Sequence, residues 1–111
     1  MFNVSVINLE SVVCIFPEGR LDTQSYESFC NVLQYHQDKE EYLIIDFTKC
    51  NYLSSSGIRL LLGASKKLSA KGGSLMLSFL PAEIFQVLEM AGLSTLLRIF
   101  GTTDKALGEI L

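Results

Sequence analysis

Apolar positions in the first quarter of the chain follow the spacing of β-strands. Alternating apolar residues at 2–9 and a continuous β-branched and aromatic run at 12–16 predict two strands. Only Glu10 and Ser11 separate the two runs, so the strands are expected to form a hairpin. The Pro-Glu-Gly segment at 17–19 is expected to end the second strand.

The rest of the chain alternates between helical and strand spacing. A helical i, i+3, i+4, i+7 pattern begins at Tyr26, after Asp22 and Thr23, which are both suitable N-cap residues. The short, nearly all-apolar run at 42–47 predicts a central strand covered on both faces. The remaining predicted elements are a loop at 48–53, a helix that follows 54–57 and ends near 71–73, a strand at 74–80, a helix that starts at Pro81 and stops at Gly92, a strand at 96–100 and a helix at 103–111.

This order of elements predicts an α/β fold. The β-α-β repeats require parallel neighbouring strands joined by right-handed crossovers. We therefore expect a mixed β-sheet, with an N-terminal antiparallel hairpin followed by parallel β-α-β units, covered by about four helices. No linker, repeat or low-complexity segment interrupts residues 1–111, so they are expected to form a single domain.

Composition excludes several classes of function. The net charge of −3 and the lack of a basic cluster argue against a nucleic-acid partner. No apolar run approaches the ~18 residues that cross a bilayer, and the start lacks the basic segment of a secretory signal, so a cytoplasmic protein without membrane insertion is expected. Three widely spaced cysteines and one histidine do not make a metal site, and Cys14, Cys30 and Cys50 are expected to be small buried residues.

The residues that could support catalysis are few. The sequence has no phosphate-loop, dinucleotide or nucleophile-elbow motif, so it is not predicted to be an enzyme or to hold a cofactor. His36, among polar neighbours, is expected to be a solvated surface residue. Asp46 lies inside an apolar strand and is expected to accept hydrogen bonds from a neighbouring loop. Gly72 and Gly73 are expected to form a turn.

The segment Ser54-Ser55-Ser56-Gly57 places three hydroxyls where a helix is predicted to begin. Free backbone N–H groups and the positive end of the helix dipole converge there, so a serine at this point is a reasonable acceptor of phosphate. Arg59, three residues after Ser56, could pair with that phosphate. The segment is also explained as an N-cap alone, because Ser54 or Ser55 suffices to cap the helix.

Several segments together resemble the STAS domains, specifically the bacterial anti-sigma factor antagonists, over nearly the whole chain. The segments that carry the resemblance are Gly19-Arg20-Leu21-Asp22, Leu43-Ile44-Ile45-Asp46-Phe47-Thr48, Tyr52-Leu53-Ser54-Ser55-Ser56-Gly57-Ile58, Ala91-Gly92-Leu93, Ile99-Phe100 and Ala106-Leu107. This chain departs from the family pattern at two positions, because Arg59 stands where many relatives carry a small residue and Ser54 stands where the family motif has an aspartate. A serine keeps the capping hydrogen bond but carries no charge.

The resemblance implies a binding switch rather than an enzyme. The unphosphorylated domain is expected to bind an anti-sigma factor that is also a serine kinase, and phosphorylation is expected to release it, with a phosphatase as a further partner. By its position directly before the motif glycine, Ser56 is the expected phosphorylation site, and Ser55 is the second choice. The expected partner-binding residues are Asp22, Ser54, Ser55, Ser56, Gly57, Arg59, Leu60 and Gly63.

Two other functions stay open from the sequence. The chain could be a STAS subunit of a membrane lipid or anion transport complex, in which no serine need be modified, because one fold supports several functions. It could also be a small enzyme or nucleotide-binding protein, for which the sequence offers no phosphate loop or acid–base pair.

Overall fold

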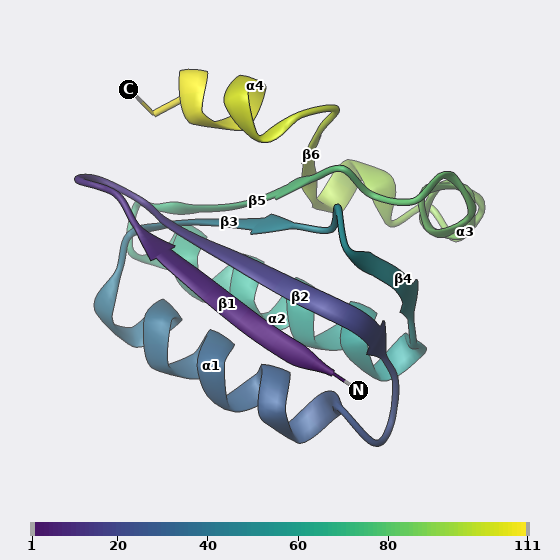
Figure 1. Ribbon diagram of the computed structural model, residues 1–111. Helices are drawn as coiled ribbons and strands as arrows, with labels where there is room; N and C mark the ends of the chain where they lie inside the picture. The colour runs from purple at the N-terminus through teal and green to yellow at the C-terminus, as the bar shows by residue number, and fades with distance from the viewer. Residues whose placement is uncertain (1, 111) are drawn as a thin grey trace.

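The computed structural model describes residues 2–110, in which strands and helices alternate largely as the sequence predicts (Figure 1). The elements are β1 (Asn3–Asn8), β2 (Val13–Leu21), α1 (Tyr26–Lys39), β3 (Tyr42–Asp46), β4 (Cys50–Leu53), α2 (Ser55–Ala70), β5 (Ser74–Ser78), α3 (Ala82–Met90), a 3-10 turn (Ser94–Leu96), β6 (Arg98–Phe100) and α4 (Thr103–Gly108).

The strands form one mixed sheet, as predicted. Its order is β1-β2-β3-β5-β6, and β4 pairs with β2 outside this path. β1 and β2 form the antiparallel hairpin, whereas the pairs β2–β3, β3–β5 and β5–β6 are parallel. Each parallel pair needs a crossover, which α1, α2 and α3 supply in turn. The strand predicted to be central, β3, lies in the middle of the sheet.

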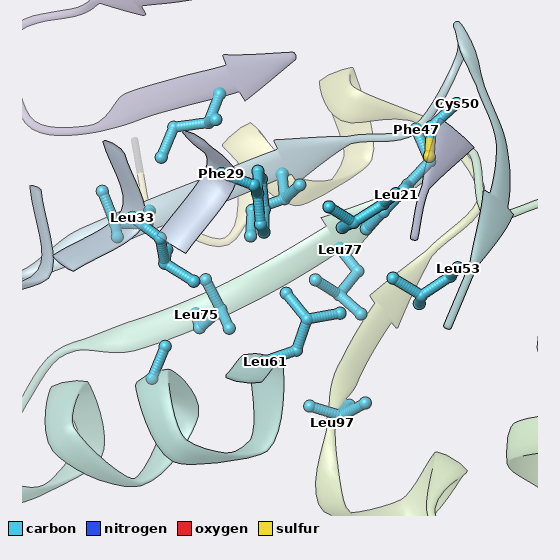
Figure 2. Packing of buried hydrophobic residues seen from close by; sticks show 14 of the residues in the cluster. Leu21, Phe29, Leu33, Phe47, Cys50, Leu53, Leu61, Leu75, Leu77 and Leu97 are labelled. Carbon is cyan, nitrogen blue, oxygen red and sulfur yellow. The ribbon is translucent and has the colours of Figure 1, made fainter. Parts of the chain in front are cut away.

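Helices cover the sheet on both faces, with α1 and α2 on one face and α4 on the other (Figure 1). The main core lies under α1 and α2, where Phe29, Leu33 and Leu61 pack with Leu75 and Leu77 of β5 (Figure 2). Each of these side chains is at most 1% exposed, and burying one stabilises the fold by about 1.5–3 kcal/mol. The cluster under α4 is smaller and contains Val12, Cys14, Ile44, Met76 and Ala106.

The carboxylate of Asp46 connects the end of β3 to α4. It accepts hydrogen bonds from the backbone N–H of Thr48 at 2.8 Å and from the hydroxyl of Thr103 at 2.7 Å. Asp46 is only 6% exposed, so these donors replace the water that burial removes. The predicted structural role of Asp46 is confirmed.

The second strand is longer than predicted, because Pro17 does not end it. β2 continues through Pro17 to Leu21, with Val4 of β1 opposite the proline. On its other side β2 pairs with β3 only as far as Ile15, so no β3 residue faces Pro17 across the ladder. Gly19, at φ +110°, accommodates the irregular register at which β2 changes partner from β3 to β4.

Other element ends also differ from the prediction. Ser25 holds the N-cap position of α1 but makes no side-chain capping bond, whereas the carboxylate of Asp22 accepts hydrogen bonds from the backbone N–H groups of Gln24 and Ser25. Pro81 is the N-cap of α3 rather than its first residue. The last strand is shorter than residues 96–100, because Ser94–Leu96 forms a 3-10 turn. α4 ends at Gly108, and residue 111 of the predicted helix lies outside the described residues. Cys14 and Cys50 are buried as predicted, whereas Cys30 is partly exposed.

The prediction that His36 is a surface residue is wrong. Its side chain is 9% exposed, because the inner face of α1 turns it toward the protein together with Phe29 and Leu33. Its Nδ1 atom is buried without a hydrogen-bond partner among the described residues. Burial lowers the pKa of His36 below its ordinary value of 6.5, and the charge of Glu40 opposes this effect.

The buried histidine predicts a loss of stability in mild acid. The unfolded chain takes up a proton at the ordinary pKa of 6.5, whereas the folded chain does so only at lower pH. Stability is therefore greatest above pH 6.5 and decreases as the pH falls below it. We expect the melting temperature to be lower at pH 5.5 than at pH 7.5, measured by thermal denaturation. His36 is the only histidine in the sequence, so a His36→Gln variant should lose most of this difference; an unchanged difference would contradict the prediction.

Candidate functional site

The end of β2 and the start of α2 lie side by side because β4 pairs with β2. The loop predicted at 48–53 contains this short strand, in which Tyr52 lies opposite Arg20 and Leu53 opposite Leu21. The backbone N–H of Ser54 donates to the carbonyl oxygen of Leu21 at 2.9 Å. The two motif segments that surround Asp22 and Ser54 are thereby joined into one surface.

Ser54 is the N-cap of α2. Its hydroxyl oxygen accepts a hydrogen bond from the backbone N–H of Gly57 at 3.2 Å, which satisfies one of the free donors at the helix start. The first turn of α2 has no acidic residue. Ser54 therefore fulfils the capping role without adding a negative charge to the positive end of the helix.

Gly57 is buried and packs closely against the ends of β2 and β4. A Cβ atom at this position would lie 2.6 Å from Cδ1 of Leu53 and 3.5 Å from the side chain of Leu21. The motif glycine lets the first turn of α2 pack closely on the ends of β2 and β4. This close packing fixes where the neighbouring serines lie.

The two candidate acceptor serines differ in their surroundings. Ser55 is exposed, whereas Ser56 is partly exposed in the first turn of α2. The Nη2 atom of Arg59 donates to the hydroxyl of Ser56 at 3.4 Å. Arg59 is itself exposed, so its guanidinium is placed to pair with an anion attached to Ser56.

Asp22 is a fixed negative charge next to this helix start. Desolvation acts to raise its pKa, but hydrogen bonds from Ser25 and from the backbone N–H of Gln24, with the charge of Arg20, outweigh that effect and lower the pKa. Arg20 also lies over the ring of Tyr52, 4.1 Å from its centroid, and its Nε atom is 3.7 Å from Asp22. Arg20 and Tyr52 were not predicted as site residues, since only recognition of β4 as a strand would have placed them together.

Five of the eight predicted partner-binding residues line two separate hollows, whereas Ser54, Ser55 and Gly57 line neither of them. Ser56, Arg59, Leu60 and Gly63 line a groove of about 510 Å³ between α1 and α2. Asp22 lines a second hollow of about 540 Å³, with Arg20 on its wall. Tyr26, Gln34 and Gln37 of α1, which the sequence did not single out, form the opposite side of the first groove.

The side chains of these hollows suit the binding of a polar, charged surface. Within residues 2–110, no group of three histidine, cysteine or carboxylate side chains is placed to hold a metal ion. None of the described helices has the length and apolar character needed to cross a membrane. The geometry combines a capped helix start, a serine hydroxyl and an arginine, next to an ionised aspartate.

The chain is similar to known proteins both in sequence and in fold. The family model described as STAS domain matches residues 3–106. The chain is 31% identical over 86 residues to the anti-sigma-B factor antagonist of Listeria monocytogenes, which covers 77% of this chain and 75% of that protein. An anti-sigma factor antagonist from Mycobacterium paratuberculosis has the same fold, with a TM-score of 0.88, 19% identity, and coverage of 99% of this chain and 94% of that one. The phosphorylated form of the Bacillus cell fate determinant SpoIIAA aligns over 100% of both chains, with a TM-score of 0.74 and 21% identity.

Proposed function

The chain belongs to the STAS domain family, among the anti-sigma factor antagonists, and on this premise we propose that it binds an anti-sigma factor and is released by phosphorylation of Ser56. The anti-sigma factor is expected to be a serine kinase as well, and the protein acts in the cytoplasm by binding rather than by catalysis. The observation that carries the proposal is the position of Ser56, partly exposed in the first turn of α2 with Arg59 in contact.

The surroundings of Ser56 favour a phosphate on electrostatic grounds. A dianion at a helix start interacts favourably with the helix dipole, by about 0.3–1 kcal/mol. Arg59 can add a charge-assisted hydrogen bond, and the first turn of α2 holds no carboxylate to repel the phosphate. In the transfer, the γ-phosphoryl group of ATP forms a bond to Oγ of Ser56 while the serine loses its proton and ADP leaves.

Phosphorylation would act on binding through charge. It adds about 1.5–2 negative charges, so a net charge of −3 becomes about −5. The added charge lies in the first turn of α2, whose N-cap Ser54 is hydrogen-bonded to Leu21, the residue before Asp22. A partner that docks here must then desolvate a dianion or meet it with a like charge, and either effect weakens the complex.

Phosphorylation in vitro tests the site. The wild type, Ser56→Ala and Ser55→Ala are incubated with ATP and each anti-sigma factor kinase encoded in the same genome, and the products are mapped by mass spectrometry. We expect one phosphoryl group on the wild type and on Ser55→Ala, and none on Ser56→Ala. Modification of Ser56→Ala to the same extent as the wild type would contradict the assignment.

The alternative of a transport-complex subunit predicts a different result in binding, phosphorylation and co-purification experiments. A chain that binds none of these anti-sigma factors and accepts no phosphate, but that co-purifies with a membrane permease, would contradict the proposed switch. In the phosphorylation experiment, Ser55→Ala serves as the matched control for Ser56→Ala, because it removes a neighbouring hydroxyl from the same helical turn.

A further inference from the structure

The outer edge of β1 is unpaired, and we propose that a second copy of this chain pairs with it through antiparallel β1–β1 contacts. Within residues 2–110, β1 pairs only with β2 and forms one end of the sheet. In Figure 1 no other strand lies along its outer side. Alternate N–H and C=O groups of a strand point to opposite edges, so about half of the polar backbone groups of β1 face outward.

β1 lacks the features that protect edge strands from pairing. Asn3–Asn8 contains no charged residue and no proline, and Ile7 is 51% exposed. The opposite edge of the sheet is different, because β6 has only three residues and includes Arg98, which is ion-paired with Glu109 at 2.9 Å. Charged side chains and short length are features that prevent edge pairing, so β1 rather than β6 is the edge suited to association.

The sequence of β1 suits pairing with itself. With a two-fold axis through Ser5, Val4 lies opposite Val6 of the second copy, and Asn3 lies opposite its Ile7. Val4 and Val6 are partly buried on the face of the main core, so this register continues an apolar face from one copy to the next. Asn3, Ser5 and Ile7 share the exposed face. A symmetric interface of this kind requires such self-complementarity.

Charge does not oppose this pairing. The carboxylate of Glu18 on β2 accepts a hydrogen bond from Ser5 at 3.1 Å. In the pair, the β2 strands of the two copies are three strand spacings apart, which is about 14 Å. Charges at this distance are largely screened at physiological salt. Because one six-residue strand buries little surface, the dimer is expected to be weak.

Sedimentation equilibrium tests the dimer with a matched pair of variants. We expect the average mass of the wild type to rise toward a dimer between about 10 µM and 1 mM. Ser5→Lys places two like charges opposite each other and should lower the association constant by about fivefold or more. Ser69→Lys makes the same change at an exposed position of α2 and should leave association unchanged. A chain that stays monomeric to about 1 mM, or equal effects of the two variants, would overturn the proposal.

Cysteine cross-linking tests the register. In a Cys30→Ser background, which removes the partly exposed thiol, Ser5→Cys should form a disulfide-linked dimer under mild oxidation. The two Cα atoms at position 5 would lie about 4.5–5.5 Å apart, within the range of disulfides. Asn3→Cys should cross-link at least tenfold more slowly, since its two copies would lie about 13 Å apart. Cross-linking of Asn3→Cys as fast as Ser5→Cys would overturn the assigned pairing.

Discussion

Ser56→Asp is expected to weaken binding to the anti-sigma factor by at least about tenfold, which corresponds to about 1.4 kcal/mol. The substitution adds a negative charge in the first turn of α2, where the proposed partner docks. Isothermal titration calorimetry with the purified anti-sigma factor measures the change. The melting temperature should stay close to that of the wild type, because a carboxylate in the first turn of a helix is favourable.

Ser56→Asn is the matched control for charge. Asparagine has nearly the shape of aspartate but no charge, so Ser56→Asn should retain most of the affinity. Equal losses in the two variants would show that size rather than charge weakens the complex. Removing Arg59 in addition, as in Ser56→Asp with Arg59→Gln, should increase the loss, because the guanidinium in contact with residue 56 no longer offsets the new charge.

Gly73→Ala is expected to destabilise the fold by about 3 kcal/mol or more. A Cβ atom at position 73 would lie 1.8 Å from the carbonyl oxygen of Glu41 and 2.7 Å from its carbonyl carbon. This carbonyl accepts a hydrogen bond from the N–H of Ser74 at 2.9 Å, where β5 begins beside β3. The backbone cannot move away without breaking the pairing of the two central strands. Thermal denaturation should show a melting temperature lower by roughly 10 °C or more. Urea denaturation should show the corresponding loss in the free energy of unfolding.

Gly63→Ala is the matched control for Gly73→Ala. Gly63 lies within α2, and a Cβ atom there would meet no atom within 4 Å. The same change should therefore stabilise the protein by about 0.5–1 kcal/mol, because alanine favours the helix. A Gly73→Ala protein that melts within about 2 °C of the wild type would show that the start of β5 can shift.

Much of the fold follows from local patterns in the sequence. The nearly all-apolar run at 42–47 identified β3, and the spacing of apolar residues after Gly57 identified α2, because burial on both faces or on one face imposes a distinct pattern. The short β4 was not predicted, since four residues of which two are exposed carry little periodicity. The path of β2 through Pro17 was missed for a different reason, because proline tolerance depends on which neighbour a strand has at that residue.

The candidate site shows the same division. The sequence by itself determined that a capped helix starts at a serine motif, because an N-cap and the residues after it interact locally. Only the tertiary structure decided that Arg20 and Asp22 lie beside that helix start, with Arg20 over the ring of Tyr52, and that His36 faces inward. These placements depend on the pairing of β4 with β2 and on the packing of α1. Contacts between residues far apart in the chain leave no periodic trace in the sequence, so they follow from the folded arrangement alone.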